Sequence, residues 1–318
     1  MKLALLDTTV CTDNLGDYII MDSVRRELTQ MFPLHHKLTI PTHEKMGRVS
    51  YDIIHRSQYA FIGGTNLLSS NMNRYNQWKV NLIDTLHVRD ILLMGVGWWQ
   101  YQKKPNAYTR YLFSKLLHSN LLHSVRDEYT HTKLNEMGFT NVITTGCPTM
   151  WQLTPDHCAL IPHKKSDTVV FTLTDYNMDR GMDQHLIDTL LAHYKTLYFW
   201  VQGTGDYAYF RSLKNTETIT VIEADLDAYD RLLDREASLD FVGTRLHAGI
   251  RALQKRHRSL IIAIDNRSVE ISKNTQLPIL ARNDIPKHLA HRITSNWETT
   301  LTLPLENIER WKQQFHPA

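Results

Sequence analysis

Cysteine, long apolar runs and a surplus of either charge are all scarce in this chain of 318 residues. Its three cysteines, Cys11, Cys147 and Cys158, are odd in number and lack metal-site spacing, which favours a reducing cytoplasm and predicts no metal. No apolar run approaches the roughly 20 residues that a membrane-spanning helix needs. The apolar start meets Asp7 too soon for a signal peptide. These absences predict a soluble cytoplasmic protein.

The charge is nearly balanced. A formal charge of +3 without any basic run is too small to predict a nucleic-acid partner. It permits an anionic small-molecule ligand or loose peripheral association with an anionic membrane. The Walker, GxGxxG, GxSxG and HExxH motifs are also missing. Nucleotide hydrolysis, ordinary NAD chemistry and α/β-hydrolase chemistry therefore lack their usual parts.

Short apolar runs alternate with longer amphipathic ones, a pattern typical of βα units around parallel sheets. In the first half, strands are predicted at 2–7, 59–64, 90–97, 121–127 and 141–147, with a helical segment at 73–86 among those between them. The pattern restarts in the second half, with strands predicted at 168–175, 196–203, 219–224, 239–244, 259–265 and 277–282.

This restart predicts two doubly wound, Rossmann-like domains that face a cleft. The expected parts are a first domain at 1–153, a linker at 154–167, a second domain at 168–300 and a C-terminal helix at 301–318 packed back on the first domain. In such sheets, ligands bind where strands end and helices begin. The candidate residues below all lie at the ends of predicted strands.

Arg245 and His247 stand where the strand at 239–244 gives way to a helix, which we expect to hold both in its first turn. A helix N-terminus attracts anions, and a guanidinium fork suits phosphate or carboxylate. His247 could carry a proton near neutral pH. The pattern indicates an anion site, although an Arg245–aspartate pair and an ordinary half-buried histidine explain it equally well.

Arg126 ends a predicted strand of the first half in the same way. If the domains face one cleft, Arg126 and Arg245 would hold one anion between two guanidinium groups. A local ion pair with Asp127 is the alternative. After the first strand, Asn14 and Asp17 are candidates for binding sugar hydroxyls, with Asp17 also a possible base or simply a helix N-cap.

Glycines and tryptophans follow two other strands. Gly63 and Gly64 permit close approach of a ligand to the backbone. Trp98 and Trp99 cannot both face one core, so at least one is expected to project as a platform for a sugar ring. Packing between loop and helix is the alternative. The glycine-bearing strand end at 201–207 is a weak candidate for phosphate or nucleotide contact.

Taken in order, the segments NLGDYIIMDSV, GGTNLL, GVG, SVRDEYTHTKLNEMGFTNVITTGCPT, FVGTRLHAGIRAL and SLIIAIDNR resemble the polysaccharide pyruvyl transferase family over residues 13–265. The resemblance implies a GT-B-like architecture. It also implies transfer of the pyruvyl group of phosphoenolpyruvate onto two hydroxyls of a sugar in a surface-polysaccharide (exopolysaccharide) precursor, leaving a ketal and phosphate. Neither a metal nor a cofactor beyond this donor is implied.

The resemblance also implies roles for the candidates. Arg126, Arg245 and the backbone at Leu246 would bind the donor, and His247 would be the general acid. Asp17 is the candidate base. The expected acceptor-binding residues are Asn14, Gly63, Gly64, Trp98 and Trp99.

Thr65 and the Trp98–Trp99 pair depart from the family pattern, because many relatives carry a third glycine and a Gly-Pro there. The acceptor sugar, its hydroxyl pair and whether it is lipid-linked or polymeric therefore stay open. Two alternatives remain. A GT-B glycosyltransferase would need a nucleotide pocket, for which 201–207 is the candidate. A non-catalytic sugar- or anion-binding protein would keep the arginines without depending on His247.

Overall fold

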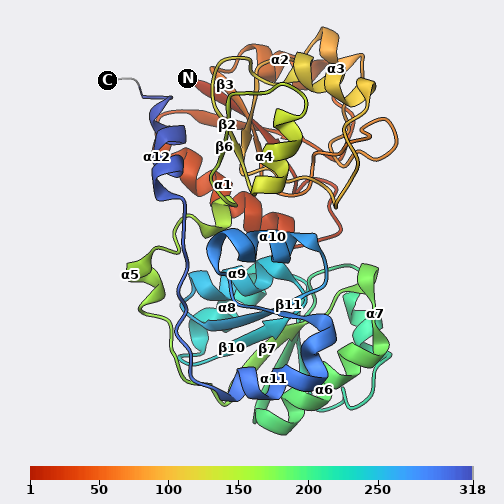
Figure 1. Cartoon of the computed structure of the whole chain (residues 1–318), viewed down its shortest axis with the longest axis vertical. Coiled ribbons are helices and arrows are strands. Elements are labelled where there is room, and N and C mark those ends of the chain that lie inside the picture. Colours follow the sequence, from red (N-terminus) through yellow and green to blue (C-terminus); the bar gives the residue numbers. More distant parts are fainter. Residues whose placement is uncertain (317–318) are drawn as a thin grey trace. The chain divides into compact units, whose positions relative to one another are not determined.

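The computed structural model describes residues 1–316, which fold into two units (Figure 1). The first unit comprises Met1–Thr12, Ile20–Trp151 and the segment from Leu303 onward. The second comprises Asp13–Ile19 and Gln152–Thr302. The short piece Asp13–Ile19 thus belongs to the second unit although it lies between two segments of the first.

The first unit contains a parallel sheet in the order β2-β1-β3-β4. Its strands are β1 (Lys2–Asp7), β2 (His36–Pro41), β3 (Tyr59–Gly63) and β4 (Ile91–Met94). A parallel pair, β5 (His123–Val125) and β6 (Val142–Thr144), continues beyond β4, where the backbone N–H of Gly95 donates to Ser124 at 3.0 Å. This is the flavodoxin-like order, which reverses between β1 and β3.

Helices of the first unit are α1 (Gly16–Met31), α2 (Arg48–His55), α3 (Ala107–Leu116), α4 (Glu128–Asn135) and α12 (Leu305–Gln313). The last of these comes from the C-terminal segment. Its Trp311 is fully buried, with its ring centroid 6.0 Å from that of Phe61 and 5.8 Å from that of Trp151. Burial of large aromatic surface attaches this helix to the core of the first unit.

The second unit contains a six-stranded sheet, all of whose pairs are parallel, in the order β12-β11-β10-β7-β8-β9. Its strands are β7 (Thr168–Thr172), β8 (Thr196–Trp200), β9 (Thr220–Ile222), β10 (Asp240–Gly243), β11 (Arg258–Ala263) and β12 (Ile279–Ala281). Numbered within the unit, this is the Rossmann order 3-2-1-4-5-6, which reverses between β7 and β10.

Helices cover both faces of this second sheet. They are α6 (Arg180–His193), α7 (Asp206–Arg211), α8 (Leu226–Arg235), α9 (Leu246–Gln254), α10 (Asn266–Thr275) and α11 (Ile285–Thr294). Figure 1 shows α9 and α10 on one face and α6 and α11 on the other. The segment predicted as a linker contains one short helix, α5 (Pro155–Cys158).

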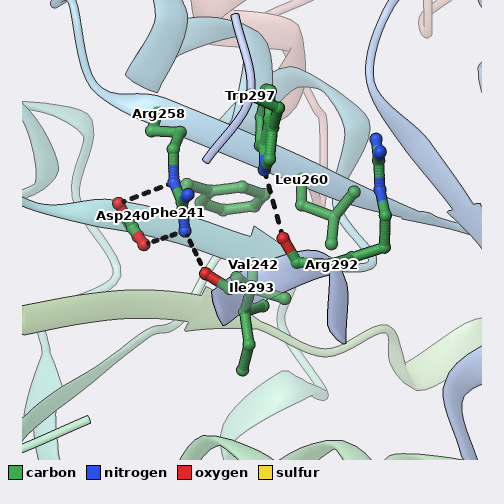
Figure 2. Close-up of a pocket in the computed structure, with 8 residues that line it drawn as sticks. All are labelled: Asp240, Phe241, Val242, Arg258, Leu260, Arg292, Ile293 and Trp297. Atoms are coloured by element: carbon green, nitrogen blue, oxygen red, sulfur yellow. Dashed lines mark hydrogen bonds and ion pairs between the residues drawn. The ribbon is translucent and has the colours of Figure 1, made fainter. Parts of the chain in front are cut away.

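A buried polar cluster closes the amino-terminal ends of β10 and β11 (Figure 2). The guanidinium of Arg258 donates to both carboxylate oxygens of Asp240, at 2.8 and 3.3 Å, and to the carbonyl of Ile293 at 2.5 Å. The hydroxyl of Tyr194 donates to Asp240 at 2.7 Å, and the ring of Trp297 lies 5.2 Å from the guanidinium. Burial raises the pKa of Asp240, which Arg258 opposes. The cluster ties α11 to the sheet, at the edge opposite the predicted site.

The α/β fold with parallel sheets is confirmed, and all six strands predicted in the second half are present. The helix predicted at 73–86 is wrong, because only Asp84–Leu86 form a 3₁₀ turn there. Asparagine and aspartate explain the difference, since Asn81 accepts from the N–H of Ile83 and Asp84 accepts from the N–H of Asn81. Such local bonds compete with helix formation. None of the helices formed by residues 1–316 is long and apolar enough to span a membrane.

Candidate functional site

Arg245 lies at the point where the second sheet reverses its strand order. It follows β10 and is the residue immediately before α9, so it caps the helix instead of lying in its first turn as the sequence predicted. Its backbone N–H donates to the hydroxyl of Thr172, the last residue of β7, at 3.1 Å. Leu246 and His247 are then the first two residues of α9. His247 is buried.

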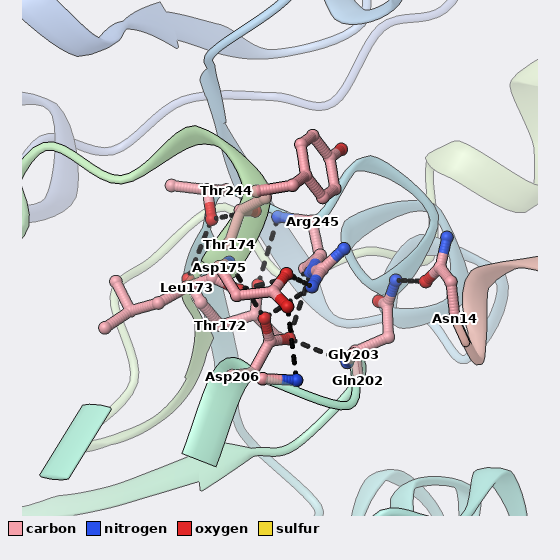
Figure 3. Close-up of polar contacts among 12 residues, drawn as sticks. Asn14, Thr172, Leu173, Thr174, Asp175, Gln202, Gly203, Asp206, Thr244 and Arg245 are labelled. Carbon is pink, nitrogen blue, oxygen red and sulfur yellow. Dashed lines mark hydrogen bonds and ion pairs between the residues drawn. The ribbon is translucent and has the colours of Figure 1, made fainter. Parts of the chain in front are cut away.

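Two carboxylates hold the Arg245 side chain, which is 3% exposed (Figure 3). Its Nε donates to Asp206 at 3.0 Å and to the carbonyl of Leu173 at 3.2 Å. Its Nη2 donates to Asp175 at 3.0 Å and also to Asp206. The alternative that Arg245 pairs with a nearby aspartate is confirmed. Burial raises the pKa of Asp206, and the charge of Arg245 works against that rise.

Gly203 explains how the guanidinium fits at this strand end. A Cβ atom at this position would collide with Nη2 of Arg245, so only glycine lets the loop after β8 lie against it. The N–H of Gly203 also donates to Asp206 at 2.7 Å, and the ring of Tyr176 lies 5.1 Å from the guanidinium. Among residues 1–316, none accepts a hydrogen bond from Nη1 of Arg245. The arginine is thus oriented through two nitrogens.

The side chain of Arg126, in the first unit, is held in a similar way to that of Arg245. Its side chain is 1% exposed, and its Nε donates to Asp127 at 2.9 Å while Nη1 donates to Asn66 at 2.7 Å. A Cβ atom on Gly97 would collide with the guanidinium. Each of the two predicted arginines therefore lies on a glycine, bonded through Nε to an aspartate. The predicted alternative of a local Arg126–Asp127 ion pair is confirmed.

Asn14 joins the first motif to the loop that carries Gly203. Its side-chain oxygen accepts from Gln202 at 2.7 Å and from the N–H of Gly16 at 3.0 Å. The N–H of Leu15 donates to the carbonyl of Gln202 at 2.9 Å. Asp17, predicted as a possible N-cap, lies inside the first turn of α1 and is buried. The side chain of Asn14, two residues before α1, accepts instead from the N–H of Gly16, the first residue of the helix.

The model of the polysaccharide pyruvyl transferase family matches residues 14–266. The chain belongs to this family, and the resemblance is confirmed. Among solved structures, the chain is similar to the E. coli heptosyltransferase WaaC with ADP-2-deoxy-2-fluoro heptose. That similarity has a TM-score of 0.43 at 10% identity and covers 92% of this chain and 100% of the other. No curated protein matches the chain.

In this family member, the glycines predicted to contact the acceptor have a packing role. A Cβ atom on Gly63 would lie 2.7 Å from the side chain of Val24, and one on Gly64 would collide with Ile20. Gly64 also has φ = +56°, a conformation that favours glycine. Both residues let α1 pack closely over the end of β3. This packing explains the glycine pair without any ligand.

The two tryptophans differ in exposure. Trp98 is fully buried, and its ring N–H donates to Gln102 at 2.9 Å. Trp99 is half-buried and stacks on Tyr75, with ring centroids 3.5 Å apart. A buried ring offers no face to a sugar, so Trp99 alone of this pair remains available to an acceptor.

The sequence analysis missed the groups that orient the two arginines. They are Asn66, Asp175 and Asp206, together with Gly97 and Gly203 as the glycines beneath the guanidinium groups. Each of these residues lies at the end of a predicted strand, and this position was the only sign in the sequence that they could belong to a site. Their pairing with an arginine depends on which strand ends meet in space. Among residues 1–316, no group of three or more His, Cys, Asp or Glu side chains is placed to bind a metal.

Proposed function

We propose that the chain transfers the pyruvyl group of phosphoenolpyruvate onto two hydroxyls of a sugar in a surface-polysaccharide precursor. Membership of the family supports this reaction. The observation that carries it is Arg245, a fixed guanidinium at the reversal point of the sheet with His247 two residues on, in the first turn of α9. Ligands of doubly wound sheets bind at this point, and a helix N-terminus favours anions.

The donor would be held by charge and geometry together. Phosphoenolpyruvate carries a phosphate and a carboxylate, both suited to guanidinium groups. Because Nε and Nη2 of Arg245 are occupied, Arg245 would reach the donor through Nη1. Arg126, which bonds through Nε and Nη1, would offer Nη2. The backbone at Leu246 would contribute the helix N-terminus.

The chemistry then needs a proton donor and a base. Transfer of a proton from His247 to the methylene carbon of the donor would create positive character at C2. One sugar hydroxyl attacks C2 and gives its proton to a base, for which Asp17 is the candidate. The C2–O bond to phosphate breaks and phosphate leaves with its electron pair. The second hydroxyl then adds to C2 and gives its proton to the deprotonated His247, which closes the ketal and restores the acid.

Calorimetry with phosphoenolpyruvate tests the donor site, using the wild-type protein, Arg126→Ala and Arg245→Lys, with UDP- and GDP-sugars titrated in parallel. Lysine keeps the charge of Arg245 but cannot donate to Leu173, Asp175 and Asp206 while reaching a ligand. We expect the wild type to bind phosphoenolpyruvate and neither nucleotide sugar. Each variant should bind phosphoenolpyruvate at least about tenfold more weakly than the wild type does. Tighter binding of a nucleotide sugar would favour the glycosyltransferase alternative, and unchanged binding in both variants would make the arginines purely structural.

A further inference from the structure

A pocket of about 560 Å³ opens in the first unit, and none of its lining residues is among those predicted for the donor. It lies just beyond the carboxyl end of β2, between the segment 43–45 and the segment 76–81. The backbone N–H of Lys79 donates to the carbonyl of Thr42 at 2.8 Å and joins the two walls. A pocket of this volume, at the carboxyl edge of a parallel sheet, has the size and place of a small-molecule site.

The lining is polar and carries more positive than negative groups. Two lysines, Lys45 and Lys79, and one carboxylate, that of Glu44, line it, and within residues 1–316 no carboxylate forms an ion pair with either lysine. His43 also lines the pocket, and its Nδ1 donates to the carbonyl of Gln77 at 3.0 Å, which leaves Nε2 for a ligand. Ammonium groups of this kind bind carboxylates and phosphates.

The remaining lining residues suit a sugar ring. Asn76 and Asn81 contribute amides, which both donate to and accept from hydroxyls. Asn76 directly follows Tyr75, which stacks on Trp99. The pocket therefore adjoins the one predicted acceptor aromatic whose ring stays accessible.

We propose that this pocket binds an acidic sugar unit, a hexose carrying a carboxylate or a phosphate. Lys45 and Lys79 bind the anionic group, while Asn76 and Asn81 bind ring hydroxyls. The proposal rests on the proposed function in one respect only, that the acidic sugar is part of the acceptor. It makes the first unit specific for an acidic glycan, although it assigns no part in the transfer of the pyruvyl group to the pocket.

Saturation-transfer NMR measures this binding without phosphoenolpyruvate. The probes are glucuronate, glucose 1-phosphate, glucose and inorganic phosphate, tested on the wild type and on a Lys45→Gln/Lys79→Gln double variant; free phosphate is followed by competition against the sugars. The matched control is Lys104→Gln/Lys287→Gln, which removes two exposed lysines outside the pocket. The melting temperature of each variant checks that it folds.

We expect at least one of the two acidic sugars to bind, with an affinity at least about fivefold higher than that of glucose and reduced at least about fivefold in the double variant only. The preferred sugar identifies the anion as carboxylate or phosphate. Absence of binding, equal binding of glucose, full competition by inorganic phosphate at equal affinity, or an unchanged double variant would each overturn the proposal. Failure of phosphoenolpyruvate to bind, with these results intact, would overturn the proposed function alone.

Discussion

Asn14 and Gln202 are 188 positions apart in the sequence, and their side chains share a hydrogen bond of 2.7 Å. Gln202 precedes Gly203, the residue on which the guanidinium of Arg245 lies. The first motif of the chain therefore contacts the loop that positions the central arginine. From this connection we expect Asn14 to have a positioning role for the proposed donor site, in addition to its predicted contact with the acceptor.

Replacement of Asn14 by alanine removes this hydrogen bond. We expect the affinity for phosphoenolpyruvate to fall about fivefold, the effect of one neutral hydrogen bond of about 1 kcal/mol. Calorimetry without any acceptor measures this effect separately from acceptor binding. Asn283→Ala, at an exposed position of the second unit, is the control and should bind as the wild type does. Equal affinity in Asn14→Ala would show that the motif does not support the arginine.

Gly203→Ala tests the contact between loop and guanidinium directly. The added Cβ atom would collide with Nη2 of Arg245, so either the loop or the arginine must move. We expect donor binding to weaken at least about tenfold, since a misplaced guanidinium loses its directed hydrogen bonds. Gly181→Ala is the control, because its Cβ atom meets Asp179 at an ordinary 3.6 Å. Wild-type affinity in Gly203→Ala would contradict the arrangement.

We expect Arg258 to affect stability and not donor binding. Its replacement by alanine leaves the buried carboxylate of Asp240 without its cation, which costs about 3–5 kcal/mol of unfolding free energy. Urea unfolding of the variant and the wild type measures this loss. The affinity of the variant for phosphoenolpyruvate should equal that of the wild type. Lys195→Ala breaks the exposed pair with Asp167 instead, and should change the unfolding free energy little. Similar losses in both variants would contradict the importance of burial.

His123 makes the stability of the first unit depend on pH. Burial lowers the pKa of His123 from 6.5 to about 4, so the unfolded chain binds a proton that the folded chain does not. The unfolding free energy should therefore rise with pH, by about 3 kcal/mol between pH 4 and pH 6.5. Urea unfolding across this range measures the slope. His123→Gln should flatten it, and an unchanged slope would assign the effect to other groups.

The sequence predicted the strands of the second unit well, because they are buried on both faces and read as continuous apolar runs. It missed β2, an edge strand whose residues are mostly half-exposed or exposed and which lacks such a run. The candidate arginines could be located because strand ends are visible in sequence. Their partners could not, because Asp175 and Asp206 meet Arg245 only where the sheet reverses its order.

The glycine pairs show a second limit of the sequence. Gly63 and Gly64 lie against Val24 and Ile20 of α1, and their contact with an acceptor stays a prediction. Gly97 and Gly203, in contrast, lie against guanidinium groups. A glycine at a strand end indicates a close approach to the backbone, and only the fold shows what approaches.

The proposed reaction consumes phosphoenolpyruvate by proton transfer from His247. Phosphorus NMR of the donor, incubated with neutral and acidic oligosaccharides of bacterial surface polysaccharides, tests it most directly, with His247→Ala compared at equal donor saturation. We expect the wild type to convert the donor signal to that of inorganic phosphate only when an acceptor is present. His247→Ala should bind the donor but convert it at least about a hundredfold more slowly. Conversion at the wild-type rate by His247→Ala, or a bound donor that the wild type never converts, would contradict the account.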